Sequence, residues 1–130
     1  MKREPVRVRI VVGGVEVLAE ISFNENPRTA EAVLEALPIE SRAARWGDEV
    51  YFEVPVELPA ENARVRVQKG EVAYWPEEPS LCIFFGKTPV SPSEDDIRAY
   101  SPVNVIGRLV SDPSVLRTVK DGDRVRVERA

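Results

Sequence analysis

The stretch Leu81-Cys82-Ile83-Phe84-Phe85 is an unbroken apolar run that lies between Ser80 and Gly86. A run of this length between turn-forming residues is typical of a strand that is buried on both faces. Such a strand lies within a sheet that has a further layer of side chains on each side. The stretch therefore predicts where the core of the protein lies.

The side chains of this strand divide between two faces, because neighbours along a strand point to opposite sides. One face is expected to fill the core and consists of Leu81, Ile83 and Phe85. Cys82 lies on the other face, where a buried thiol is inert. Phe84 shares that face, under a helix or in a cleft, and we predict that it reaches a ligand-binding cleft near Trp75.

Alternating apolar and polar residues predict further strands around this run. These strands are expected at residues 6–12, 15–21, 49–55, 65–67, 72–74 and 103–110, with a last strand around Val125 and Val127. Gly13-Gly14 is expected to form a two-residue hairpin turn between the first two strands. Residues 88–100, which contain Pro89 and Pro92, are expected to form a long loop.

Two helices are expected. Asn26 can cap the first helix, Pro27 suits its first position and Pro38 ends it. Its apolar stripe consists of Ala30, Val33, Leu34 and Leu37. Asp112-Pro113 begins a second, short helix. Two helices cannot cover both faces of a large sheet, so we predict one mainly β domain over residues 1–130: a closed antiparallel β-barrel with two short helices capping the ends.

The composition excludes many kinds of site. The 130 residues include one cysteine and no histidine, which removes Ser-His-Asp and Cys-His catalysis and the usual zinc sites. We expect no cofactor and no metal. The acidic triplet Glu94-Asp95-Asp96 lacks the ligand spacing of a calcium loop, so it is expected to be a solvated loop.

The formal net charge of −4 makes nucleic-acid binding an unfavoured function. The arginine pairs Arg7/Arg9, Arg64/Arg66 and Arg124/Arg126 alternate with valines and are expected to line solvated strand faces. No apolar stretch approaches the roughly 20 residues of a membrane span. Met1 to Pro5 leads straight into a strand pattern, so we expect no signal peptide and a cytoplasmic location. The richness in Arg, Glu, Val and Pro is typical of a thermophile protein.

Five segments carry a family resemblance: residues 26–32 (NPRTAEA), 46–52 (WGDEVYF), 70–76 (GEVAYWP), 81–89 (LCIFFGKTP) and 102–107 (PVNVIG). Together they resemble the cyclophilin-like barrels, most closely the small prokaryotic cyclophilin-like proteins of unassigned function. The resemblance covers nearly the whole chain and implies their barrel. True cyclophilins are peptidyl-prolyl isomerases, and their Phe-His-Arg motif is missing here. The resemblance leaves Arg45 as the candidate catalytic arginine and Phe84 as a cleft residue.

The candidate ligand-binding residues are Glu49, Tyr51, Tyr74, Trp75, Phe84 and Asn104. Glu49, Tyr51 and Glu53 share one strand face, and Trp46 lies next to Glu49 and Tyr51. Paired carboxylates on such a face can do acid–base work if one of them has a raised pKa, or the face is simply solvated. Tyr74 and Trp75 end a strand and form either a pocket floor or a plug at the barrel end. Asn104 either pins a neighbouring loop or lines the pocket.

Three functions remain open. The first is a module that binds a peptide or a small molecule and lacks the full isomerase catalytic set. The alternative is a weak peptidyl-prolyl cis-trans isomerase in which Arg45 holds the carbonyl of the twisted prolyl amide. The third is an interaction domain of a larger enzyme assembly. We expect neither nucleic acid nor membrane as a partner.

Overall fold

The computed structural model describes residues 3–130 and shows a mainly β chain. Its elements are, in chain order, β1 (Val6–Val12), β2 (Val15–Ile21), α1 (Pro27–Glu35), β3 (Ile39–Trp46), β4 (Glu49–Glu53), β5 (Arg64–Val67), β6 (Glu71–Trp75), β7 (Ser80–Phe84), β8 (Ile97–Leu109), η1 (Pro113–Thr118) and β9 (Arg124–Arg129). Met1 and Lys2, part of the segment from which we expect no signal peptide, lie outside the described residues.

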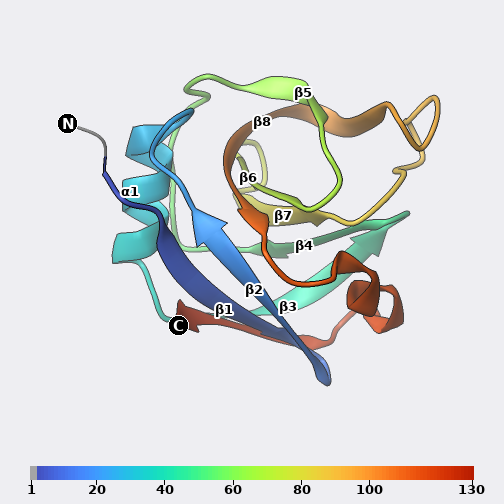
Figure 1. Cartoon of the computed structure of the whole chain (residues 1–130), viewed down its shortest axis with the longest axis horizontal. Helices are drawn as coiled ribbons and strands as arrows, with labels where there is room; N and C mark the ends of the chain where they lie inside the picture. Colours follow the sequence, from blue (N-terminus) through green and yellow to red (C-terminus); the bar gives the residue numbers. More distant parts are fainter. Residues whose placement is uncertain (1–2) are drawn as a thin grey trace.

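The strands follow one another in a ring. Their order is β2-β1-β9-β3-β4-β7-β6-β8, and β2 pairs in turn with β8, while β5 is attached to β8 beyond the ring. All of these pairings are antiparallel. Figure 1 shows α1 and η1 on opposite sides of the strands. The predicted mainly β, antiparallel fold with two short helices is thus confirmed.

Gly107 lies where β2 meets β8. It pairs with Ile21, and a Cβ atom built on Gly107 would collide with the backbone oxygen of Glu20. Only a glycine allows the two backbones to approach this closely. This residue is therefore what lets the two strands pair and complete the ring.

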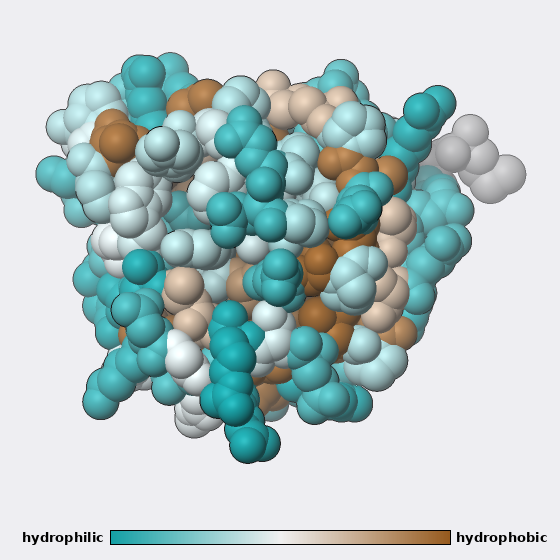
Figure 2. Space-filling model, turned by 180° about the vertical axis from the view of Figure 1, so that it is seen from behind, coloured by the Kyte–Doolittle hydropathy of each residue, from teal (hydrophilic) through white to brown (hydrophobic). Residues whose placement is uncertain are grey.

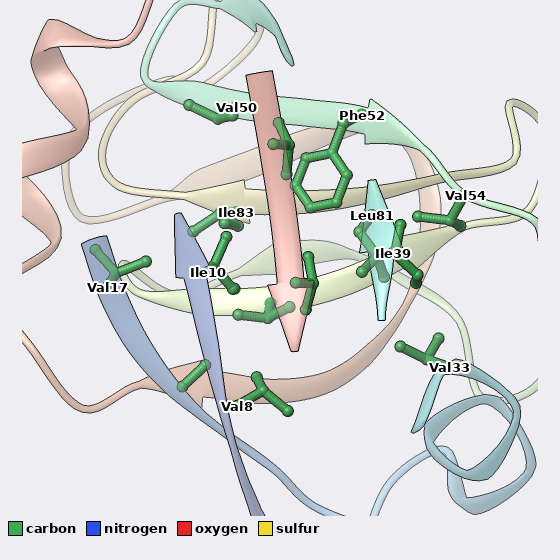
Figure 3. Packing of buried hydrophobic residues seen from close by; sticks show 14 of the residues in the cluster. Val8, Ile10, Val17, Val33, Ile39, Val50, Phe52, Val54, Leu81 and Ile83 are labelled. Carbon is green, nitrogen blue, oxygen red and sulfur yellow. The ribbon is translucent and has the colours of Figure 1, made fainter. Parts of the chain in front are cut away.

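The core divides into two clusters that meet at β7. The inner cluster contains Leu81, Ile83 and Phe85, as predicted. Figure 3 shows Leu81 and Ile83 among the side chains that converge on the inside of the ring. Cys82 and Phe84 belong to an outer cluster with Val67, Ile97, Ala99, Val103 and Val105. The strand is thus buried on both faces, as its sequence predicts, but β5 and the first half of β8 cover its outer face instead of a helix.

Two segments differ from their prediction. Residues 39–46 were not expected to be a strand, because Ile-Glu-Ser-Arg-Ala-Ala-Arg-Trp has little apolar alternation and few residues that favour strands. Pairing with β4 on one side and β9 on the other makes this segment β3. The expected loop over residues 88–100 is also shorter, since β8 already begins at Ile97.

The helix caps are partly as predicted. Asp112 accepts a hydrogen bond from the Ser114 amide at 3.0 Å, although the segment it caps is a 3-10 helix. Asn26 makes no such bond, which corrects its predicted role. Its buried side chain donates to the Val105 carbonyl instead. The amides at the start of α1 bond to the Glu61 carboxylate, which comes from a distant loop. α1 ends at Glu35, before the expected end at Pro38.

The surface carries the arginine pairs. Ion pairs join Arg7 to Glu20, Arg9 to Glu128, Arg64 to Glu25 and Glu71, Arg66 to Asp96, and Arg126 to Glu40 and Glu128. Figure 2 shows a largely hydrophilic face in which hydrophobic residues form a short strip. Neither helix in residues 3–130 is long and apolar enough to cross a membrane.

Candidate functional site

A small pocket lies on the outer side of the strand ring. Its volume is about 130 Å³, and its walls are Trp46, Glu49, Tyr51, Trp75 and Tyr100. These side chains come from β3, β4, β6 and β8. Four aromatic rings and one carboxyl group therefore meet at one place, although they come from four strands spread over residues 46–100.

Strand register explains why the pocket forms here. Trp46 pairs with Glu49 across β3 and β4, so both side chains project from the same face. In the next row Tyr51 pairs with Cys82, and Cys82 pairs with Ala73. Cys82 and Ala73 are small, so they leave room above the strands for the large rings on either side.

The four rings contact one another in sequence. The ring centroids of Tyr51 and Trp75 are 5.8 Å apart, those of Trp75 and Tyr100 are 6.1 Å apart, and those of Tyr100 and Trp46 are 5.9 Å apart. The indole nitrogen of Trp75 donates to the Ser101 hydroxyl at 2.7 Å, which fixes the orientation of that ring. Two of these contacts are edge-to-face and the one between Trp75 and Tyr100 is tilted, and such contacts hold aromatic side chains in place. The walls of the pocket are thus ordered by their own contacts.

Glu49 is the charged group of the pocket. Only 4% of it is exposed, and among residues 3–130 no basic side chain forms an ion pair with it. Burial raises the pKa of Glu49 from 4.5 to about 7, and a hydrogen bond with the Cys82 thiol has a smaller effect in the opposite direction. A buried carboxyl group without a basic partner in an apolar pocket is typical of functional sites. Near neutral pH it can accept or give a proton, or balance a cation.

Acidic side chains act on the wall of this pocket. The pKa of Tyr51 is raised, first by burial and then by the charges of Glu78, Glu49 and Asp121. Burial also raises the pKa of the Cys82 thiol well above its ordinary value, so this group stays protonated, in line with its predicted inertness. The groups that shift the pKa values of Glu49, Tyr51 and Cys82 are therefore all neutral or acidic.

Three of the predicted ligand-binding residues lie in the pocket, namely Glu49, Tyr51 and Trp75. Tyr74 points to the inside of the ring, where its hydroxyl donates to the Val56 carbonyl at 2.6 Å and accepts from the Leu58 amide at 3.1 Å. Phe84 is fully buried in the outer cluster and does not line the pocket. The structure therefore separates residues that the sequence grouped together.

Asn104 pins a loop, which was one of its two predicted roles. Its side-chain oxygen accepts from the Glu61 amide at 2.9 Å. Its nitrogen donates to the Thr29 hydroxyl at 3.0 Å and to the Pro59 carbonyl at 3.2 Å. Asn104 thereby connects β8 to the loop that caps α1, and it lies apart from the pocket walls.

Arg45 lies on the inner face of β3, because it pairs with the core residue Val50. Its guanidinium group donates to the carbonyls of Gly47, Arg117 and Val119 at 2.9 to 3.1 Å. It also lies 4.9 Å from the centre of the Phe85 ring. Phe84, its predicted partner, projects from the opposite face, so the structure does not bring Arg45 and Phe84 into one cleft.

The acidic triplet near β8 is mostly exposed. Glu94 and Asp95 face solvent, and Asp96 forms ion pairs with Arg66 and Arg98. Throughout residues 3–130, no three side chains of His, Cys, Asp or Glu are close enough together to hold a metal ion.

Tyr100 is the pocket residue that the sequence reasoning missed, because it was assigned to the loop over residues 88–100. A signal was present. Ile97 and Ala99 are apolar and alternate with Arg98 and Tyr100, which is the period of a half-buried strand. Trp46 was noted only as a neighbour of Glu49 and Tyr51. Its contribution depends on the unexpected strand β3.

The fold and this pocket define a small antiparallel β protein with an aromatic site outside its strand ring. The chain belongs to the cyclophilin-like family, whose model matches residues 6–128. It is 45% identical to the hypothetical protein AF2241 from Archaeoglobus fulgidus, whose solution structure matches over 98% of both chains with a TM-score of 0.83. The family resemblance seen in the sequence is thus confirmed.

A second solved structure shares the fold. McbB, solved in complex with tryptophan, is 21% identical and matches with a TM-score of 0.74 over 94% of this chain and 44% of the McbB chain. The comparison with curated proteins finds no match.

Proposed function

We propose that this protein is a ligand-binding module, built on a cyclophilin-like closed barrel, and that its binding site is the pocket between Trp46 and Tyr100. One observation carries the proposal: four aromatic rings surround a buried carboxyl group that has no basic partner. A buried carboxyl without a basic partner destabilises a fold, so a ligand that interacts with it accounts for its presence.

The size of the pocket limits the ligand. Pockets that enclose a whole small molecule have volumes of about 300–1,000 Å³. This pocket has about 130 Å³, so it holds one group of a ligand while the remainder lies on the surface. Both a small molecule and a side chain of a peptide meet this condition. McbB was solved in complex with tryptophan, which makes indoles a sensible part of a first screen.

Intrinsic fluorescence offers a direct test. The chain has two tryptophans, Trp46 and Trp75, and both line the pocket. A fragment screen of indoles, short prolyl peptides and small amines should therefore find ligands that change the emission. Tyr100→Ala should weaken these ligands without unfolding the protein, since 68% of Tyr100 is exposed. Val90→Ala changes an exposed apolar residue outside the pocket and serves as the control.

The affinities of the ligands for the pocket variants and for the control variant test the proposal. Ligands that lose affinity in Tyr100→Ala and in Glu49→Gln, but not in Val90→Ala, support it. Ligands that bind both pocket variants as tightly as the wild type have their site elsewhere and refute it.

The isomerase alternative requires an arginine beside a cleft for X-Pro. Arg45 already donates to three backbone carbonyls on the inner face of β3. We therefore expect cis/trans isomerisation of a proline tetrapeptide to proceed at the uncatalysed rate. Isomerisation that is fast in the wild type and lost in Arg45→Ala would make the alternative the better account.

A further inference from the structure

The aromatic pocket has the features of a cation-binding cage. The faces of Trp and Tyr rings carry negative partial charge and attract organic cations within about 6 Å. Tyr51, Trp75, Tyr100 and Trp46 form a continuous series of rings whose neighbouring centroids are 5.8 to 6.1 Å apart. Glu49 adds a full negative charge at the same place when it is ionised.

The charges nearby favour a cation over an anion or a neutral ligand. The ionisable groups that act around Glu49 are Cys82 on β7 and Tyr51 on β4, and Glu78 and Asp121 act on Tyr51 in turn. All of them are neutral or negative at neutral pH. An anion would meet repulsion here, whereas a cation would relieve the unpaired charge of Glu49.

The size of the pocket and the hydration of the ligand limit which kind of cation can bind. An apolar cavity of about 150 Å³ takes a molecule as large as benzene. The pocket, at about 130 Å³, therefore has room for a nitrogen with several methyl groups. A primary ammonium is a strongly hydrated point charge and loses its water at high cost in such a site. Methylation weakens hydration and adds apolar surface that packs against the rings.

From this geometry we propose that the pocket binds a methylated ammonium group, with Glu49 as its counter-ion. The inference rests on the proposed ligand-binding function of the same pocket and names the chemical class of the ligand. Such a group occurs on small molecules such as choline and on methylated lysine side chains.

A bound methylated ammonium group and a proton compete for the carboxylate of Glu49. Burial holds the pKa of this carboxyl at about 7, so at lower pH the cation meets a neutral group. The affinity for a methylated ammonium should therefore rise as the pH increases through about 7 and level off above it. Glu49→Gln cannot ionise, so its affinity should not change over the same range.

The deciding experiment compares two ligands of equal shape. Choline and its uncharged isostere, in which a tert-butyl group replaces the trimethylammonium group, are titrated at about pH 8 by tryptophan fluorescence and calorimetry. We expect choline to bind at least about tenfold more tightly than the isostere. Glu49→Gln should remove this preference and keep the binding of the isostere. Glu53→Gln changes an exposed carboxyl on the same strand and should leave the preference intact.

Each result has a distinct meaning. Equal affinity for the two ligands overturns the cation inference but leaves the pocket as a binding site for apolar groups. Absence of choline binding also overturns it, and the fragment screen then decides separately whether the pocket binds anything. A parallel titration with a trimethyllysine peptide and its unmodified lysine form separates the two sources of the group. Tighter binding of the trimethyllysine peptide than of choline indicates a modified protein, and the reverse indicates a small molecule.

Discussion

Replacing Glu49 by glutamine should change how the stability of the protein depends on pH. The glutamine keeps the size and polarity of the side chain but cannot ionise. In the folded protein burial raises the pKa of Glu49 to about 7, while in the unfolded chain it returns to 4.5. The wild type must therefore lose stability as the pH rises, and the variant should escape that loss.

The size of the effect follows from the two pKa values. Below 4.5 the carboxyl is protonated in both states and adds no pH dependence. Between 4.5 and about 7 the unfolded chain gives up its proton and the folded protein keeps it, which favours unfolding. One pKa unit corresponds to about 1.36 kcal/mol, so the folded wild type loses about 3 kcal/mol over this interval. Above about 7 the loss is complete and constant.

Urea denaturation measures this difference. The free energy of unfolding of the wild type and of Glu49→Gln is determined at several values between about pH 4 and about pH 9. Urea is preferable to guanidinium, because a cationic denaturant is itself a candidate ligand of the aromatic pocket. All other titrating groups are common to the two proteins, so their contributions cancel in the difference.

The difference curve should rise by about 3 kcal/mol in favour of the variant between about pH 4 and about pH 8. Glu53→Gln, which changes an exposed carboxyl on β4, should give a flat difference curve. A curve for Glu49→Gln that stays flat within about 0.5 kcal/mol would refute the reasoning, because the carboxyl would then not be desolvated.

Three further changes test structural assignments, each by urea denaturation. Arg45→Ala should lower the free energy of unfolding by about 2–3 kcal/mol through its lost carbonyl contacts and leave ligand affinity unchanged. The control Arg42→Ala loses one exposed contact to a carbonyl and should lower it by less than about 1 kcal/mol. Lost ligand affinity in Arg45→Ala would contradict the structural role of Arg45. Asn104→Ala should cost about 2–3 kcal/mol, because it removes three hydrogen bonds made by a fully buried side chain. Gly107→Ala should cost about 3 kcal/mol, since its Cβ meets the backbone of β2, whereas Gly14→Ala has open space and should stay within about 0.5 kcal/mol. Equal stability of the two glycine variants would mean that β2 and β8 do not approach so closely.

Structural features that depend only on residues close together in the sequence could be predicted. The alternation of Leu81, Ile83 and Phe85 with Cys82 and Phe84 correctly assigned these residues to two buried faces. The hairpin at Gly13-Gly14 and the Asp112 cap also depend on neighbouring residues only, and both are present. β3 was missed, because its residues have little strand preference and become a strand only through pairing with β4 and β9.

The candidate site was predicted in part, for a physical reason. Alternation places Glu49 and Tyr51 on one strand face, and the residue pattern places Trp75 at the end of another strand. Only the pairing of the strands shows that these side chains project to the outside of the ring. Tyr100 could not be added to them, because only the folded path of β8 brings its ring to 6.1 Å from the ring of Trp75. Arg45 and Phe84 were grouped by resemblance, but side chains that are matched by segment can still project from opposite faces of a sheet.

The sequence by itself determined the mainly β character, the buried strand at its centre and the lack of histidine chemistry, since these follow from composition and from alternation along one strand. Only the tertiary structure decided what covers Phe84 and which side chains surround Glu49. Both depend on contacts between strands that are far apart in the chain. The central strand β7 contributes side chains to both core clusters. The pocket lies where the outer cluster ends, because Cys82 and Ala73 are too small to fill the space beneath the aromatic rings.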